Sequence, residues 1–185
     1  MMTHYIDIDI LQDAEMNSNV LMNTLFAKVH LQLAKGEQSN IGVSFPNFKK
    51  TLGDMLRLHG DKDSLQAILA SNMMAGLKDY TKTTAVKQAP AHCQYRTVER
   101  VQVKSSLERL YRRSVKAGKV TEEDALVKIQ TGTNKMLKLP YLQVVSKSTG
   151  QSFRLFVKHG QIQGNETAGA FTKYGLSSTA TIPWF

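Results

Sequence analysis

The sequence lacks the features of a secreted, disulfide-bonded or membrane-spanning protein. Its one cysteine, Cys93, can form no internal disulfide and supplies no cysteine-rich zinc site, which favours a reducing compartment. The N-terminus has no basic segment followed by an apolar run, and no stretch approaches the ~20 apolar residues of a membrane span. We therefore expect a cytoplasmic protein without a membrane partner.

Internal repeats and low-complexity tracts are also absent. Hydrophobic residues make up 42% and charged residues 21% of the chain, which is close to the globular average and excludes a disordered or collagen-like protein. A length of 185 residues fits one large domain or two small ones.

The net charge of +9 is distributed unevenly. Residues 1–93 are neutral, with nine basic and nine acidic side chains, whereas residues 94–185 carry fifteen basic and six acidic side chains. The stretch 94–119 alone has a net charge of +6. A solvated basic surface would explain such a concentration, but so would a polyanionic partner such as a nucleic acid.

The N-terminal half reads as an alternation of strands and helices. Residues 4–10 alternate apolar and polar side chains, as a half-buried strand does, and 17–35 repeat apolar residues at helical spacing before Gly36. Further strands are expected at 41–46, 55–59 and 81–88, with a helix from 63 that extends through Leu77. The order β-α-β-β-α-β predicts a ferredoxin-like domain over 1–93, a fold shared by RRM-type RNA-binding modules.

Residues 94–185 are expected to form a smaller α+β domain. Strand patterns lie at 97–103, 139–146, 152–159 and 171–176, and a second short helix begins near Thr121. Ser105 and Glu108 have the capping-box spacing that opens a helix over 106–117, which Gly118 ends. The predicted class of the whole chain is therefore α+β.

The helix at 106–117 has a basic face and an apolar face. Arg109, Arg112, Arg113 and Lys116 are spaced i, i+3, i+4 and i+7, while the opposite face carries Leu107, Leu110, Tyr111 and Val115. Like charges at this spacing repel one another, so the basic face favours an external anion. Arginine suits phosphates and guanine edges, and we expect an RNA partner.

Catalytic and metal-binding signals are weak when the residues are taken alone. His30 borders the apolar stripe of the first helix, where a histidine is usually only packed or solvated. The other four histidines have no metal-ligand spacing, and Asp7 with Asp9 more often forms the polar face of a strand than a Mg²⁺ site. We expect no metal and no cofactor.

Nine segments, taken in order from end to end, resemble the type I-F CRISPR pre-crRNA-processing endoribonucleases. The most specific are the run STGQSFRLF at 148–156 and the terminal PWF at 183–185. The others are 25–30 (LFAKVH), 41–46 (IGVSFP), 100–102 (RVQ), 108–113 (ERLYRR), 146–147 (SK), 159–160 (HG) and 174–177 (YGLS).

The resemblance implies an enzyme that binds the stem-loop of CRISPR repeat RNA and cleaves at its 3′ base without metal. The ribose 2′-hydroxyl attacks, the products are a 2′,3′-cyclic phosphate and a 5′-hydroxyl, and the enzyme stays on the mature crRNA in a type I-F surveillance complex. The resemblance also makes His30 the catalytic imidazole, Ser146 the anchor of the 2′-hydroxyl and Tyr174 the residue that orients His30.

The same resemblance assigns the RNA contacts. Arg100 and Gln102 would read base edges at the foot of the stem, Phe153 would stack on its terminal base pair, and the arginine-rich helix would enter its major groove. The RNA-binding residues are then Arg100, Gln102, Lys104, Arg109, Arg112, Arg113, Lys116 and Phe153.

Two differences from the family and one rival reading stay open. Lys116 and Ala117 stand where family members can carry a further arginine pair, and Ser148 is close enough to Ser146 to exchange roles with it. The rival is a noncatalytic RNA-hairpin-binding protein of an RNP, which would use the same basic helix without needing His30, Ser146 and Tyr174 to converge.

Overall fold

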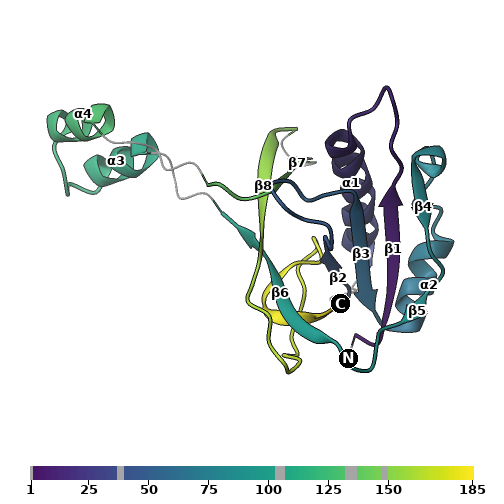
Figure 1. Ribbon diagram of the computed structural model, residues 1–185. Coiled ribbons are helices and arrows are strands. Elements are labelled where there is room, and N and C mark those ends of the chain that lie inside the picture. Colours follow the sequence, from purple (N-terminus) through teal and green to yellow (C-terminus); the bar gives the residue numbers. More distant parts are fainter. Residues whose placement is uncertain (1, 37–39, 103–106, 132–136, 147–149) are drawn as a thin grey trace. The chain divides into compact units, whose positions relative to one another are not determined.

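The computed structural model describes residues 2–36, 40–102, 107–131, 137–146 and 150–185 (Figure 1). The chain divides into two units, one made of residues 1–101 and 139–185 and the other of residues 102–138. The predicted Ser105 cap and the residue Lys104 lie outside the described residues.

Helix α1, Ser18–Lys35, forms where the apolar repeat predicts it. The Asn17 side chain caps its N-terminus by accepting a hydrogen bond from the Asn19 N–H, and the helix ends before Gly36. Its buried face consists of Leu21, Met22, Leu25, Phe26, Val29 and Leu33. Because this stripe is apolar along its full length, α1 is held against the sheets by packing and not by helix propensity.

The first sheet contains five described strands and is antiparallel throughout, with the order β2-β3-β1-β4 and β5 also pairing with β1. The strands are β1 (His4–Ile10), β2 (Gly42–Ser44), β3 (Met55–Gly60), β4 (Thr81–Thr83) and β5 (Lys87–Gln88). Ile6 lies opposite Leu58 and Ile8 opposite Leu56, and all four are fully buried. The period-two pattern of residues 4–10 is thereby confirmed as a strand with one buried face.

Helix α2, Lys62–Ala70, is shorter than predicted. Asp61 caps its start by accepting from the Ser64 N–H, but the expected extension through Leu77 is wrong. Asn72 and Gly76 have positive φ values of 52° and 74°, so the backbone turns there and reaches the short 3₁₀ helix η1, Lys78–Tyr80. Met73 and Leu77 are nevertheless buried, which is why the spacing resembled a helix.

The second sheet is antiparallel with the order β7-β8-β6-β9. Its strands are β6 (Gln94–Val101), β7 (Tyr141–Val145), β8 (Ser152–His159) and β9 (Ser177–Trp184). The strand predicted at 171–176 is wrong: residues 172–175 form a turn, and the strand follows it as β9. Pro183 is accommodated because β9 is an edge strand of this sheet.

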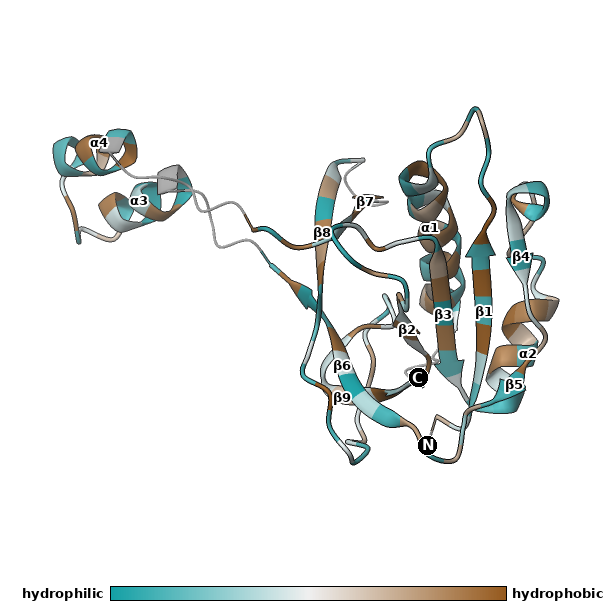
Figure 2. Cartoon of the chain, viewed as in Figure 1, coloured by the Kyte–Doolittle hydropathy of each residue, from teal (hydrophilic) through white to brown (hydrophobic). Residues whose placement is uncertain are grey.

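One hydrophobic core joins the two sheets and α1. Buried side chains of the second sheet, such as Val98, Leu155 and Ile182, belong to the same cluster as Ile8 and Leu25. Figure 2 shows apolar residues concentrated along α1, β1 and β3, where this core lies. Residues 94–101 and 139–185 therefore group with residues 1–93, and the contacts divide the chain at a different place from the 93/94 boundary expected from sequence.

The second unit contains two helices, α3 (Leu107–Lys116) and α4 (Glu122–Thr131), which pack on each other. Gly118, with φ 66°, ends α3 as predicted. Tyr111 and Val115 are half-buried, but Leu110 is 49% exposed, so it does not belong to the packed face. No described helix in the chain is both long and apolar enough to cross a membrane.

A buried ion pair crosses the first sheet. Both carboxylate oxygens of Asp7 accept hydrogen bonds from the Arg57 guanidinium, at 2.6 and 3.0 Å, and the side chains are only 12% and 9% exposed. The guanidinium also contacts the rings of Tyr5 and Phe185, which touch each other edge to face, and donates to the Phe185 carbonyl. This arrangement ties the last residue of the sequence to β1 and β3.

Two histidines, His59 and the half-buried His159, have buried ring nitrogens without full hydrogen bonding. His159 stacks on Phe48 at 3.8 Å between ring centroids, and neither ring nitrogen has a partner among the described residues. His59 bonds Ser44 Oγ through Nε2 only. Burial, with a smaller contribution from a nearby arginine, lowers the pKa of each ring from 6.5 to about 3.

Removing one member of the buried pair should destabilise the protein strongly. Arg57→Met leaves the Asp7 carboxylate buried and unpaired, so we expect a loss of roughly 3–5 kcal/mol in the free energy of unfolding measured with urea. Lys158→Met is the matched control, because it breaks the exposed pair with Glu99 and should cost less than about 1 kcal/mol. Equal losses in the two variants would contradict this assignment.

Stability should fall as the pH drops below 6.5, because His59 and His159 bind protons in the unfolded chain while their rings stay neutral in the folded protein down to about pH 3. Each contributes a slope of at most about 1.4 kcal/mol per pH unit down to its folded pKa. His159→Phe keeps the ring contact with Phe48 and should lessen the stability lost between neutral and acidic pH, whereas exposed His92→Phe should not. An unchanged pH dependence in His159→Phe would argue against a neutral buried imidazole.

Candidate active site

His30 is held by the backbone of a distant turn. It lies on the last turns of α1 and is half-buried, and its Nδ1 is 2.8 Å from the carbonyl oxygen of Lys173. A carbonyl oxygen can only accept a hydrogen bond, so Nδ1 carries the proton in this contact. The neutral ring then has its lone pair on Nε2, the nitrogen that can accept a proton from a substrate.

Tyr174 covers one face of the His30 ring. The two rings are nearly parallel, at 16°, with centroids 4.3 Å apart. The Tyr174 ring also stacks on Phe26, one helical turn before His30, at 6.3 Å. The imidazole is thus restrained both in its plane, by the Lys173 carbonyl, and across its face, by Tyr174.

Arg100 brings a positive charge to this cluster. It is exposed near the end of β6, and its guanidinium lies 5.6 Å from the centre of the Tyr174 ring and 5.4 Å from that of Phe153 on β8. Contacts thus connect His30 to Tyr174, Tyr174 to Arg100 and Arg100 to Phe153. The four residues come from four separate parts of the chain. A cation and an aromatic ring beside an imidazole can hold a phosphate and a base next to a proton acceptor.

Ser146 follows directly after β7 and is half-buried. Its N–H donates to the Gln151 carbonyl at 2.9 Å, and its carbonyl accepts from the Gly150 N–H at 2.8 Å. These bonds close the β7–β8 connection, so the position of Ser146 is fixed by the hairpin. Ser148, the alternative to it, lies outside the described residues.

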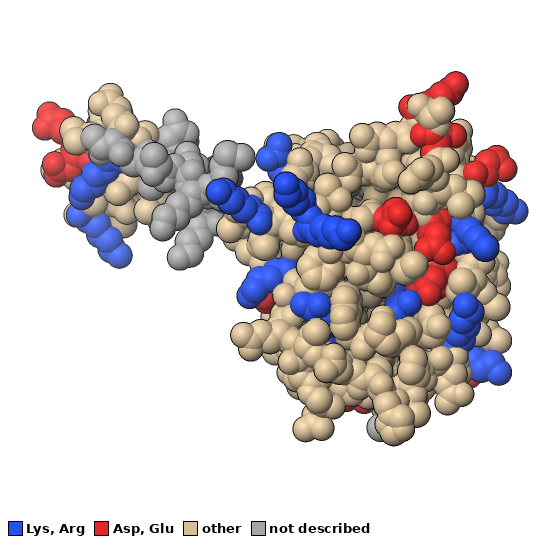
Figure 3. Space-filling model, in the orientation of Figure 1, with Lys and Arg blue, Asp and Glu red and all other residues tan. Residues whose placement is uncertain are grey.

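The basic residues of α3 are all exposed. Arg109, Arg112, Arg113 and Lys116 share one face of the helix, and Figure 3 shows basic side chains on the surface of this unit. The acidic residues are Glu108 on α3 and Glu122, Glu123 and Asp124 in the first turn of α4. Gln102 is exposed and belongs to the same unit as α3, whereas Arg100 and Phe153 belong to the other.

The described residues contain no group of three or more His, Cys, Asp or Glu side chains arranged to hold a metal ion. Asp7, one of the two carboxylates considered for Mg²⁺, is fully engaged by Arg57. Burial and the charges of Asp7 and Asp54 raise the pKa of Asp9, the other one.

Sequence reasoning missed the contribution of Lys173. Its functional atom is a backbone oxygen, which every residue possesses, so no residue type marks the position. Only the neighbouring Tyr174-Gly175 pair, a flexible glycine after an aromatic residue, hinted at a turn there.

Comparisons with known proteins cover the whole chain. The family model described as CRISPR-associated protein (Cas_Csy4) matches residues 5–185. Two curated relatives are both named CRISPR-associated endonuclease Cas6/Csy4, and each is similar over the full length of both chains. The one from Escherichia coli (strain UTI89 / UPEC) is 46% identical over 184 residues, and the one from Pseudomonas aeruginosa (strain UCBPP-PA14) is 41% identical over 187 residues. The chain therefore belongs to the Cas_Csy4 family of CRISPR-associated proteins, which confirms its predicted place among the type I-F pre-crRNA-processing endoribonucleases.

Proposed function

We propose that the protein is a metal-independent endoribonuclease that cleaves CRISPR repeat RNA at the 3′ base of its stem-loop. The observation that carries the proposal is the restraint of His30 by the Lys173 carbonyl and the Tyr174 ring. With Nδ1 donating to that carbonyl, Nε2 of the neutral ring carries the lone pair that a proton acceptor requires. Family membership supplies the class of RNA.

The chemistry needs no cofactor, because the RNA contains its own nucleophile. His30 Nε2 takes the proton of the ribose 2′-hydroxyl, the 2′-oxygen bonds to the adjacent phosphorus, and the bond to the 5′-oxygen breaks. The products are a 2′,3′-cyclic phosphate and, once the leaving oxygen has gained a proton, a 5′-hydroxyl. Arg100, whose guanidinium lies 5.6 Å from the centre of the Tyr174 ring, would offset the negative charge that develops on the phosphate.

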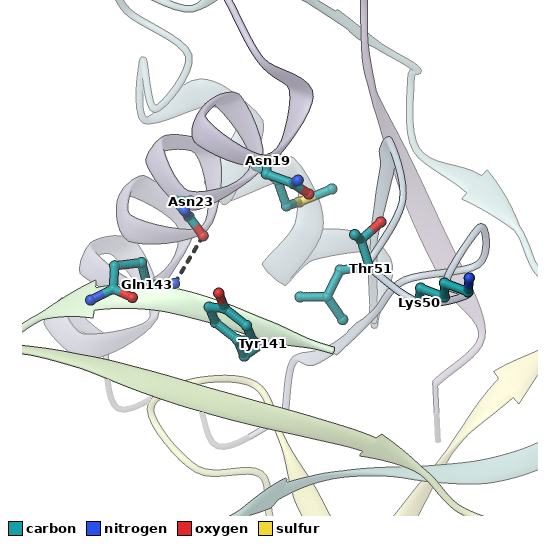
Figure 4. Close-up of a pocket in the computed structure, with 8 residues that line it drawn as sticks. Asn19, Asn23, Lys50, Thr51, Tyr141 and Gln143 are labelled. Atoms are coloured by element: carbon teal, nitrogen blue, oxygen red, sulfur yellow. Dashed lines mark hydrogen bonds between the residues drawn. The ribbon is translucent and has the colours of Figure 1, made fainter. Parts of the chain in front are cut away.

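The register of α1 against β7 supports a role for Ser146 beside His30. The Asn23 side-chain oxygen accepts a hydrogen bond from the Gln143 N–H at 2.9 Å. Figure 4 shows Asn19 and Tyr141 toward one end of these two elements and Asn23 and Gln143 toward the other, so both run in the same direction. His30 is seven helical residues beyond Asn23, ~10.5 Å, and Ser146 is three strand residues beyond Gln143, ~10 Å. His30 and Ser146 therefore lie at nearly equal distances, measured along α1 and β7, from the hydrogen bond between Asn23 and Gln143.

Binding of the hairpin is proposed for the second half of the chain. Arg109, Arg112, Arg113 and Lys116, with Lys104, would contact phosphates in the major groove, while Arg100 and Gln102 read base edges and Phe153 stacks on the terminal base pair. The exposure of the described α3 residues and the contact of Arg100 with Phe153 support these roles.

The remaining proposals concern organisation. The order β2-β3-β1-β4, with α1 and α2 as the crossing helices, supports a ferredoxin-like domain for residues 1–93 that carries His30, and residues 94–185 would form the RNA-binding part. The protein would act in the cytoplasm. It would remain on the mature crRNA as one subunit of a type I-F surveillance complex.

His30→Ala should separate cleavage from binding. Loss of a general base typically costs 10²–10⁴-fold, so we expect single-turnover cleavage of the repeat hairpin to slow by at least about 100-fold. Hairpin affinity should persist, because the proposed binding residues are untouched. The exposed His92→Ala is the matched control and should cleave at the wild-type rate.

Two results would contradict the assignment in different ways. Normal cleavage by His30→Ala would move the catalytic role to another residue. Wild-type protein that binds the hairpin but leaves it uncut would favour the rival, a noncatalytic hairpin-binding protein of an RNP.

The salt dependence of hairpin binding should report the α3 contacts. Each neutralised phosphate contributes about 0.7–0.9 to the slope of log affinity against log salt, so Arg112→Ala combined with Arg113→Ala should lower the slope by roughly 1.4–1.8. The exposed Lys78→Ala, on η1, serves as the control with an unchanged slope. A double variant with the wild-type slope would place the phosphate contacts elsewhere.

A further inference from the structure

A tight turn presents the Lys173 carbonyl to His30. The Thr172 N–H donates to the Leu176 carbonyl at 3.0 Å, and the Gly175 N–H donates to the Thr172 carbonyl at 2.8 Å. The Thr172 hydroxyl donates to the Leu176 carbonyl at 3.0 Å and accepts from the Tyr174 N–H at 3.3 Å. Thr172 therefore bonds both peptide groups that flank Lys173, one through its carbonyl oxygen and the other through its hydroxyl.

The turn is attached to the edge of the first sheet through Gly175. The Val43 N–H, on strand β2, donates to the Gly175 carbonyl at 2.7 Å. Gly175 has φ +69°, and a Cβ atom there would lie 2.3 Å from Val43 Cγ2 and 3.2 Å from Leu33 Cδ1. Only glycine allows this approach, because a side chain would push the turn off both β2 and α1.

We infer that Thr172 and Gly175 are positioning residues that select the tautomer of His30 through the Lys173 carbonyl. The turn fixes that carbonyl 2.8 Å from Nδ1, so the neutral ring keeps its proton on Nδ1 and offers Nε2 to the RNA. A histidine free in water exchanges between both tautomers, and one of them would point an N–H at the nucleophile instead of a lone pair. The effect on cleavage rests on the proposed function, whereas the effect on the tautomer does not.

The tautomer is measured directly by NMR of the full chain labelled with ¹⁵N in histidine, and His30→Ala identifies the His30 signals. In the wild type we expect the Nδ1–H form at a pH where the ring is neutral. Thr172→Val removes the hydroxyl but keeps the branched shape, and Gly175→Ala displaces the turn, so both should show a mixture of the two tautomers. Thr172→Ser restores the hydroxyl and should restore the Nδ1–H form.

Cleavage and binding are measured on the same variants. Thr172→Val and Gly175→Ala should slow single-turnover cleavage roughly 10- to 100-fold, as misplacement of a catalytic group does, while the hairpin affinity stays unchanged. Gly76→Ala is the matched control, because Gly76 has φ +74° with no atom within 4 Å of its would-be Cβ. It introduces similar backbone strain and should leave the tautomer and the rate as in the wild type.

An Nε2–H form in the wild type would overturn the inference, as would Thr172→Val protein with wild-type tautomer and wild-type rate. Thr172→Val also decides the matter if Gly175→Ala fails to fold. Normal cleavage by His30→Ala would instead contradict the proposed function. The tautomer measured in the wild type and in Thr172→Val would still test the inference about Thr172 and Gly175.

Discussion

The hydrogen bond from His30 Nδ1 to the Lys173 carbonyl is the contact on which the candidate active site depends. It joins α1, near the start of the chain, to the turn before β9, near its end. The bond can form only because α1 buries its apolar face in a core shared by both sheets, and because the turn is fastened to β2 at Val43. Stability of the core and geometry of the imidazole are thus two consequences of the same packing.

The concentration of basic side chains and the His30 imidazole lie in different parts of the sequence. The net positive charge lies beyond residue 93 and includes the exposed face of α3, whereas the imidazole belongs to the neutral N-terminal half. Arg100 contacts Tyr174 and Phe153, so it connects the imidazole cluster with a surface suited to a base.

Periodicity predicted the elements whose burial alternates regularly. The strand β1, the helix α1 and the strand β7, whose side chains are exposed and buried by turns, all occur where the apolar pattern placed them. The pattern failed at residues 171–176, where Phe171 and Leu176 are buried on either side of a turn, and at β9, whose burial follows no simple alternation. It failed again after Ala70, because burial of Met73 and Leu77 imitates helical spacing.

The site was less predictable than the fold, since His30, Ser146 and Tyr174 came from family resemblance and not from spacing. Physical reasoning alone favoured a packed or solvated His30. The partner of that histidine is a backbone oxygen, and the contact joins residues 143 positions apart, so no local pattern encodes it. Three-dimensional structure was needed to show which ring nitrogen is left for the substrate.

The central claim, that His30 activates a nucleophile supplied by the RNA itself, is tested most directly by the substrate. Two repeat hairpins are compared in excess EDTA, one unmodified and one carrying a single 2′-deoxyribose 5′ of the scissile phosphate. The account predicts that the unmodified hairpin is cleaved to a 2′,3′-cyclic phosphate and that the 2′-deoxy hairpin is bound equally well but stays intact. Cleavage of the 2′-deoxy hairpin, or loss of all cleavage in EDTA, would contradict it.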